Sequence, residues 1–223
     1  YDMTKNSKID NQRLIQAIYD ATRNGMLIGH NIVFDLHMLT NIYKVIDHNN
    51  VMDTMTLIRL GTDAVPEKRG GAPLKLKQFA KKYIDSNATI YESEIERLKT
   101  KVAQDLNAQF FSQFKGQKKK IEDILNEGPN DVDDLPEPYK SAYKKWYDSL
   151  PRLIRRNMTE PLLNKDFIPY DMIDRKTLLT YAIYDAIFTY EAYMMLRPLV
   201  TTRGNDKILE AECKLILPIL RMT

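Results

Sequence analysis

Two short segments, GHNIVFDLHML at 29–39 and YAIYDAIFT at 181–189, carry side chains that could act together in catalysis. Tyr181 and Asp185 are four residues apart, and Asn31 and Asp35 have the same spacing. Residues with this spacing project from the same face of a helix. If the two helices face each other, the two aspartates converge. The segments therefore predict a site that combines carboxylates with an amide and a phenol.

Converging carboxylates in a chain with few histidines favour Mg²⁺ or Mn²⁺, because these hard cations prefer oxygen ligands. Two such ions about 4 Å apart can activate water, hold a scissile phosphate and neutralise the leaving oxygen. A tyrosine beside that water would orient it, since a pKa of about 10 makes a poor base at neutral pH. A zinc site through His30 and His37 is the alternative, but it has no cysteine or third clustered ligand.

The elements that must position these residues follow from the hydrophobic pattern, which predicts short strands alternating with helices. It predicts a helix over 8–23, strands at 26–28 and 51–52, and helices from 31, over 53–60 and over 74–84, with a loop at 61–73. This alternation indicates an α/β layer. Asn31 and Asp35 lie just past a strand end, where open α/β sheets gather their ligands.

Residues 86–165 differ in character, because they are rich in Lys, Glu, Asp, Gln and Asn and show helical patterns at 95–114 and 139–150. We interpret them as a mostly helical insertion. Its aromatic residues predict a small core, and a base-stacking platform is the alternative; they are Phe110, Phe111, Phe114, Tyr143, Trp146 and Tyr147.

The C-terminal part predicts two further helices. Asp174 can cap a long helix over 175–200, with Pro198 near its end. A last helix over 207–220 follows Gly204. It contains the only cysteine of the chain, Cys213, in an apolar pattern that predicts burial and not a catalytic thiol.

Composition limits the possible classes of protein. The 223 residues, of which 43 % are hydrophobic and 28 % charged, suit one substantial globular domain or one domain with a large insertion. With no long apolar run or leader pattern, we expect no membrane role and a cytoplasmic location. The net charge of +3 is too small to indicate nucleic-acid binding. Basic residues that could meet phosphates, or form solvated helix faces, are Lys75, Lys77, Lys81, Lys82, Lys115 to Lys120, Arg152, Arg155 and Arg156.

The two chemistry-bearing segments resemble motifs of a known family. GHNIVFD resembles the second exonuclease motif of the proofreading domains of family A DNA polymerases, and YAIYDAIFT resembles their third motif, Tyr-x-x-x-Asp, which marks the tyrosine branch of the DEDD exonucleases. VMDTMTLIRL and LKLKQFAKKYI look like the intervening segment, and ILEAECKLILPIL resembles the helix leading into the polymerase. The resemblance covers 8–85 and 165–223.

This resemblance implies a partial ribonuclease H-like α/β fold. The exonuclease domain would span 1–202, lacking its N-terminal strands and carrying the insertion at 86–165, and 203–223 would begin the helix into a polymerase domain. The implied partners are the 3′ end of single-stranded DNA, primer-template DNA, the rest of a polymerase chain, and a replisome partner bound by the insertion. A phage source, and so the cytoplasm of a host cell, is implied by the long insertion.

The resemblance also implies roles for individual residues in 3′→5′ hydrolysis with two Mg²⁺ or Mn²⁺ ions. Asp35 and Asp185 would bind the metals, and Tyr181 would contact the attacking water. Three further residues fall where the family contacts the 3′-terminal nucleotides: His30, Asn31 and Phe34. Phe34 could stack on a base and Asn31 could hydrogen-bond a sugar or phosphate oxygen.

The sequence departs from the family in two ways. The first motif, Asp-x-Glu on an opening strand, is absent, so we expect it to come from upstream of Tyr1 and the chain alone to be weak or inactive. The separation of 150 positions from Asp35 to Asp185 exceeds the usual separation. Two alternative functions stay open: a catalytically inactive exonuclease-like scaffold that binds DNA, and an RNA exonuclease of the ribonuclease D kind, which the last helix disfavours.

Overall fold

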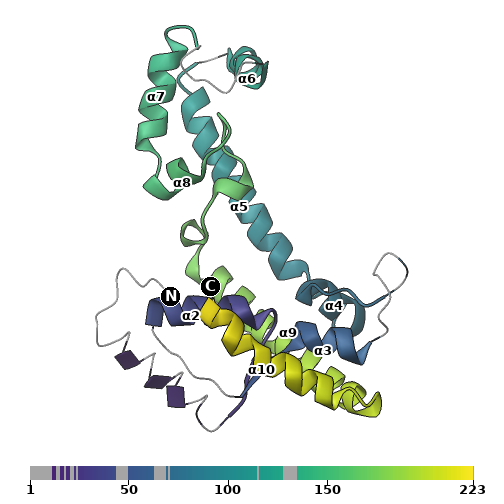
Figure 1. Ribbon diagram of the computed structural model, residues 1–223. Helices are drawn as coiled ribbons and strands as arrows, with labels where there is room; N and C mark the ends of the chain where they lie inside the picture. The colour runs from purple at the N-terminus through teal and green to yellow at the C-terminus, as the bar shows by residue number, and fades with distance from the viewer. Residues whose placement is uncertain are drawn as a thin grey trace. The chain divides into compact units, whose positions relative to one another are not determined.

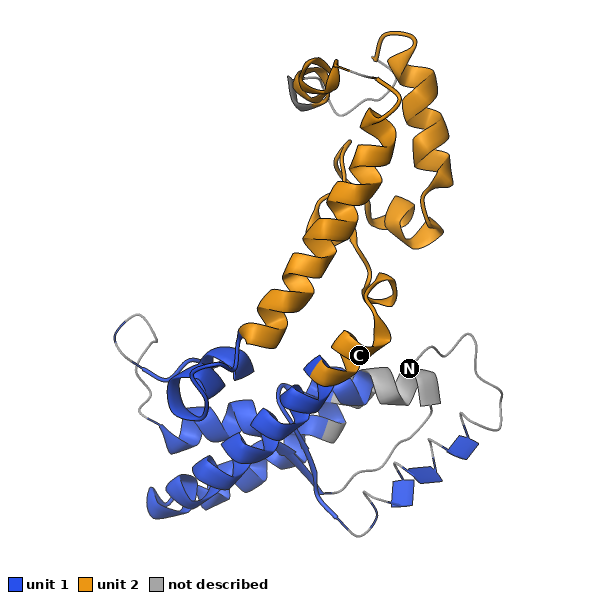
Figure 2. Ribbon diagram, turned by 180° about the vertical axis from the view of Figure 1, so that it is seen from behind, with its two compact units in different colours: residues 1–89, 181–223 blue, residues 90–180 orange. Residues whose placement is uncertain are grey.

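A computed structural model describes most of the chain, and the described residues are mostly helical (Figure 1). They are 12–13, 16–17, 19–20, 23, 25–43, 50–62, 69, 71–114, 116–127 and 135–222. The chain divides into two compact units, unit 1 with residues 1–89 and 181–223, and unit 2 with residues 90–180 (Figure 2). The predicted insertion, 86–165, lies largely within unit 2.

Unit 1 contains a parallel pair of short strands, β1 (Leu27–Gly29) and β2 (Val51–Asp53), with Gly29 opposite Asp53. Helix α2 (Ile32–Tyr43) begins soon after β1 and packs against it. A Cβ atom on Gly29 would lie only 2.6 Å from the Ile32 side chain, so this tight exit from the strand requires glycine. Both predicted strands and the predicted start of α2 are thus confirmed to within about one residue.

In the described part of unit 1, four further helices follow: α3 (Thr54–Gly61), α4 (Leu76–Tyr83), α9 (Arg175–Thr202) and α10 (Asp206–Met222). Each matches a predicted helix, and the Asp174 side chain accepts a hydrogen bond from the Thr177 N–H at 2.9 Å, as expected of a cap. The largest apolar cluster of this unit joins α3, α4, α9 and α10. Its buried members are Leu57, Ile58, Phe79, Ala192, Leu196, Val200 and Leu209.

Unit 2 is built from helices and short turns. Its elements are α5 (Ile90–Phe111), α6 (Lys118–Glu127), α7 (Tyr139–Ser149), α8 (Arg152–Asn157), and the 3₁₀ turns η3 (Lys165–Phe167) and η4 (Tyr170–Met172). The helical character predicted for the insertion is confirmed. Asn107 of α5 ties down the return segment, because its side chain exchanges two hydrogen bonds with the backbone of Leu163.

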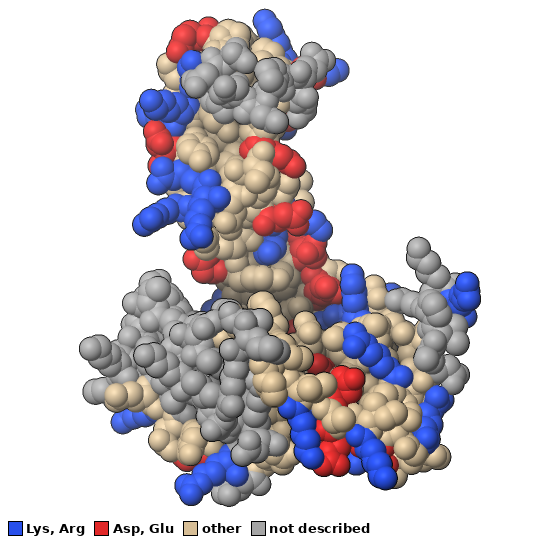
Figure 3. Space-filling model, viewed as in Figure 1, with Lys and Arg blue, Asp and Glu red and all other residues tan. Residues whose placement is uncertain are grey.

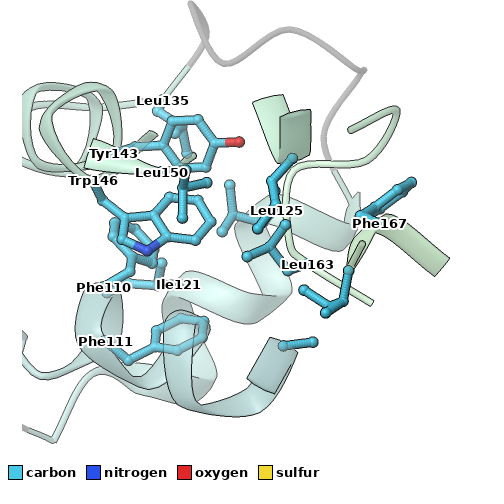
Figure 4. Packing of buried hydrophobic residues seen from close by; sticks show 13 residues of the cluster. Phe110, Phe111, Ile121, Leu125, Leu135, Tyr143, Trp146, Leu150, Leu163 and Phe167 are labelled. Atoms are coloured by element: carbon cyan, nitrogen blue, oxygen red, sulfur yellow. The ribbon is translucent and has the colours of Figure 1, made fainter. Parts of the chain in front are cut away.

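The core of unit 2 is aromatic (Figure 4). The fully buried Phe110 ring lies 5.4 Å from Trp146 and 5.7 Å from Tyr143, centroid to centroid. Both partners satisfy their polar atoms, since Trp146 Nε1 donates to the Leu106 carbonyl at 2.9 Å and the Tyr143 hydroxyl donates to the Pro161 carbonyl at 2.7 Å. Burial raises the pKa of Tyr143 to about 12. The prediction of a core is confirmed, and these rings do not form a base-stacking platform.

The α/β expectation holds only for the β1–α2–β2 segment. Among the described residues the sheet has two strands, and the rest of the regular structure is helical. The predicted helix over 8–23 lies mostly outside the described residues. No helix in the described part of the chain is both long and apolar enough to cross a membrane.

Candidate active site

One face of α9 presents three side chains to a single lysine. Tyr181, Asp185 and Phe188 follow each other at spacings of four and three residues, so they share one side of the helix. Lys77 of α4, whose residue is 7 % exposed, reaches this side and forms an ion pair with Asp185. Its Nζ also lies 4.6 Å from the centroid of the Tyr181 ring and 5.2 Å from that of Phe188. The predicted pair on α9 is therefore linked to a buried cation.

The predicted carboxylate from the first segment, Asp35, lies in the first turn of α2. The residue is exposed overall, but its carboxyl group is partly withdrawn from water. This partial burial raises the pKa of Asp35, and the negative charges of Asp53 and Asp185 raise it further. The structure thus brings the two predicted segments close enough for their carboxylates to repel each other.

Asp53, at the end of β2, is a buried carboxylate that the sequence interpretation did not assign to the site. It is 5 % exposed and caps α3 by accepting the Met55 N–H at 2.8 Å. The same oxygen, Oδ1, accepts the Asn31 N–H at 2.9 Å. An Asp directly before an apolar helical run is an N-cap signal, and that signal could have identified it. Asp53 therefore fixes the turn that leads into α2.

The turn after β1 carries the predicted nucleotide-contacting residues. Asn31 adopts a left-handed conformation with φ 56°, and both it and Phe34 are exposed, Phe34 to 64 %. His30 is half-buried. The Thr54 hydroxyl donates to the Gly29 carbonyl at 3.2 Å, and His30 Nδ1 lies 3.0 Å from Thr54 Oγ1, within hydrogen-bond distance.

The pKa of His30 is lowered, chiefly by burial and against the opposing charge of Asp53. The neutral imidazole is therefore favoured. The ring also forms a hydrogen bond with the Leu74 backbone, which raises the pKa of His30 against the effect of burial. A neutral imidazole has one donor and one acceptor nitrogen. It adds no positive charge to the carboxylates nearby.

The described carboxylates near the exit of β1 are too few to enclose a divalent cation by themselves. In the described part of the chain, no group of three or more His, Cys, Asp or Glu side chains is close enough together to hold a metal ion. Mg²⁺ commonly binds through only one or two carboxylates and completes its shell with waters and substrate phosphates. Asp35 and Asp185 fit that mode, whereas they do not provide a site made of protein ligands alone.

The basic residues that could meet phosphates differ in exposure. Lys77 is buried, whereas Lys75, Lys81 and Lys82 of the same region are exposed. Arg155 lies 3.7 Å from Asp148 as an ion pair, and Lys115 lies outside the described residues. In the face drawn in Figure 3, Lys and Arg side chains are interspersed with Asp and Glu on both units.

Taken together, unit 1 places a phenol, two carboxylates, a neutral imidazole and an exposed phenyl ring around the exit of β1 and one face of α9. Such a set can bind a cation, orient a water molecule and stack on a planar ring. Comparisons with protein-family models, with curated proteins and with solved structures gave no match for this chain.

Proposed function

We propose that this chain carries part of the active site of a 3′→5′ exonuclease, the proofreading portion of a family A DNA polymerase. The observation that carries the proposal is the approach of Asp35 to Asp185, beside Tyr181, from segments far apart in the sequence. The fold proposed for unit 1 is a ribonuclease H-like exonuclease domain. In it, β1 and β2 would be adjacent parallel strands of a larger sheet.

In this proposal, Asp35 and Asp185 hold Mg²⁺ or Mn²⁺. When bound, the ions supply the charge that activates water and stabilises the leaving oxygen of the 3′-terminal phosphodiester. Tyr181 orients the attacking water through its hydroxyl group. Phe34, with most of its side chain in solvent, is available to stack on a terminal base, and Asn31 to bind the sugar or phosphate backbone.

The proposed site requires more carboxylates than Asp35 and Asp185. In the family, they come from an Asp-x-Glu motif on a strand of the same sheet. Among the described residues β1 pairs only with β2, and in this proposal a further strand pairs with the other edge of β1. A strand there would place its side chains near the exit of β1, where Asp35 and His30 lie.

One observation favours a second function. Because Lys77 already neutralises Asp185, the site can exist without a cation, which suits a catalytically inactive exonuclease-like scaffold that binds DNA. In either case the single-stranded 3′ end is the proposed ligand, and the rest of a polymerase chain and a replisome partner on unit 2 are proposed contacts. An RNA exonuclease of the ribonuclease D kind differs only in its substrate.

A cleavage assay separates these functions. The gene product that includes this chain and any preceding Asp-x-Glu strand is incubated with 5′-labelled single-stranded DNA or RNA and Mg²⁺ or Mn²⁺. We expect stepwise shortening of DNA from its 3′ end. Faster cleavage of RNA than of DNA would support an RNA exonuclease of the ribonuclease D kind. Binding of DNA without cleavage would support the catalytically inactive scaffold.

Substitutions on α9 test the assigned roles. Asp185→Ala should reduce cleavage by on the order of 10³-fold, since it removes a metal ligand. Tyr181→Phe should reduce it by about 10²-fold or less while Mn²⁺ affinity is retained. Tyr190→Phe, an exposed phenol on the same helix, is the matched control and should leave the rate unchanged. Equal loss of metal affinity in the Asp185 and Tyr181 variants would contradict the roles.

A further inference from the structure

Lys77 is an unusual residue for its position. It lies on the short helix α4 in a region whose other lysines, Lys75, Lys81 and Lys82, are exposed, yet it is 7 % exposed. Buried lysines are rare because withdrawing an ammonium group from water is costly unless it is paired. Its charge is matched by Asp185, and its remaining surroundings include the faces of the Tyr181 and Phe188 rings.

These contacts are held in place by packing on both sides. Phe188 is 3 % exposed and packs with Ala80 and Ala88, and Ala80 lies three residues after Lys77 on α4. The ammonium group is therefore fixed by a helix that is itself packed against α9. A flexible surface lysine would instead lose rotamer freedom to form such a pair.

The position of this cation matters because it occupies the carboxylate that the proposed function gives to a metal ion. Nζ and a divalent cation both need the Asp185 oxygens. The Lys77 ammonium group and a divalent cation would also repel each other if both contacted the Asp185 carboxylate. The pKa of Asp35, by contrast, is raised first by burial and then by the negative charges of Asp53 and Asp185, with no cation among the causes of its shift.

We propose that Lys77 is a resident counter-ion of the site, which holds Asp185 beside Tyr181 and must release the carboxylate when a divalent cation binds. This inference rests on the proposed function. Lys77 acts through Asp185 and Tyr181 and is a positioning residue. Its release makes cation binding weaker than the carboxylates alone would allow, so a divalent cation binds the free protein weakly and binds more tightly when a substrate phosphate contributes further ligands.

The test measures Mn²⁺ affinity of the whole chain by electron paramagnetic resonance. Lys77→Met keeps the length and apolar stem of the side chain and removes the charge, so it should lower the Kd for Mn²⁺ by about tenfold. Lys81→Met removes the same charge from an exposed position on the same helix and should change the Kd less than twofold. A purely structural role for Lys77 predicts unchanged or weaker binding in Lys77→Met, and either result would overturn the inference.

Lys77→Arg keeps the test decisive if Lys77→Met does not fold, as judged by circular dichroism and thermal unfolding. The guanidinium group retains the competing charge and can pair with both oxygens of a carboxylate. Mn²⁺ should therefore bind Lys77→Arg as weakly as the unsubstituted chain, or more weakly. Tighter binding by Lys77→Arg refutes the competition.

Asp185→Asn separates failure of this inference from failure of the proposed function. If Asp185→Asn binds Mn²⁺ as well as the unsubstituted chain, Asp185 is not a ligand and the proposed function fails. If Asp185→Asn loses binding but Lys77→Met does not gain it, only the counter-ion role is wrong. If no variant binds Mn²⁺, the competition is refuted, and DNA cleavage by the longer gene product still decides the proposed function.

Discussion

Unit 1 and unit 2 use their aromatic side chains in different ways. In unit 2, Phe110 is surrounded by other rings and has no exposed surface. In unit 1, Phe34 is 64 % exposed and Tyr181 lies against a buried ammonium group. Unit 2 therefore uses these rings in a closed core. Unit 1 also buries Phe79 and Phe188, but it places Phe34 in solvent and Tyr181 beside a charged group.

The two units also differ in how completely they cover their apolar residues. Helix α9 buries Phe188, Ala192, Leu196 and Val200 on one side. On its other side, large apolar residues are 41 % to 56 % exposed; they are Ile183, Ile187, Tyr190 and Met194. A helix that is apolar all round normally lies inside a larger core. The described part of unit 1 therefore leaves one stripe of α9 uncovered, whereas the large apolar residues exposed in unit 2 come from separate elements; they are Ile90, Leu153, Tyr170 and Leu179.

The largest expected effect contrasts two phenylalanines. Phe110→Ala should lower the free energy of unfolding by about 3–5 kcal/mol, because it leaves a cavity among packed rings. Phe34→Ala, at an exposed position, should change it by less than about 0.5 kcal/mol. Urea unfolding followed by Trp146 fluorescence measures the first effect, and circular dichroism measures both. Similar losses of stability in Phe110→Ala and Phe34→Ala would contradict the difference between the buried ring of unit 2 and the exposed ring of unit 1.

A smaller loss of stability is expected for substitutions of the two aspartates that cap helices. Asp53→Ala should cost about 2 kcal/mol, because it leaves the N–H groups of Met55 and Asn31 without their buried acceptor. Asp53→Asn keeps an acceptor oxygen and should cost less. Asp174→Ala removes an exposed cap and should have the smaller effect of the two alanine variants. Thermal unfolding of the three variants ranks their losses of stability. Equal losses in the two alanine variants would show that burial of Asp53 adds nothing to its stabilising effect.

A still smaller effect concerns pH. The pKa of Asp35 is higher in the folded protein than in the unfolded chain, so the folded state binds the proton more tightly. The charged carboxylate therefore destabilises the fold above the folded pKa, and this penalty disappears below the unfolded pKa. Asp35→Asn should raise the Tm at pH 7, and the gain should vanish on acidification through that window. A gain that persists at low pH would assign the effect to something other than the charge.

The smallest expected effect lies on the exposed side of α9. Ile183→Ser should change the free energy of unfolding by less than about 0.5 kcal/mol and should reduce binding of the dye ANS, which detects exposed apolar surface. Phe188→Ala, on the opposite side of the same helix, should instead cost about 3 kcal/mol. Urea titrations of the two variants make the comparison. A large loss of stability in Ile183→Ser would mean that this side of α9 is packed against other residues.

Local signals explain why most of the helices and both strands could be predicted. The strand ending at Gly29, the cap at Asp174 and the four-residue spacing of Tyr181 and Asp185 depend on neighbours in sequence, whose periodicity and turn chemistry are readable directly. The same holds for the aromatic core of unit 2, because its rings recur within predicted helices. The number of strands in the sheet could not be predicted in the same way, since strand pairing joins segments that are distant in sequence.

The sequence by itself determined which residues of α2 and α9 share a helix face, because helical geometry converts spacing into direction. Only the tertiary structure decided what those faces meet. Lys77 stood in a run of lysines that suggested phosphate binding or a solvated face, but its partner Asp185 comes from a helix far along the chain. Burial of one lysine among exposed neighbours depends on that long-range contact, and no local pattern encodes it.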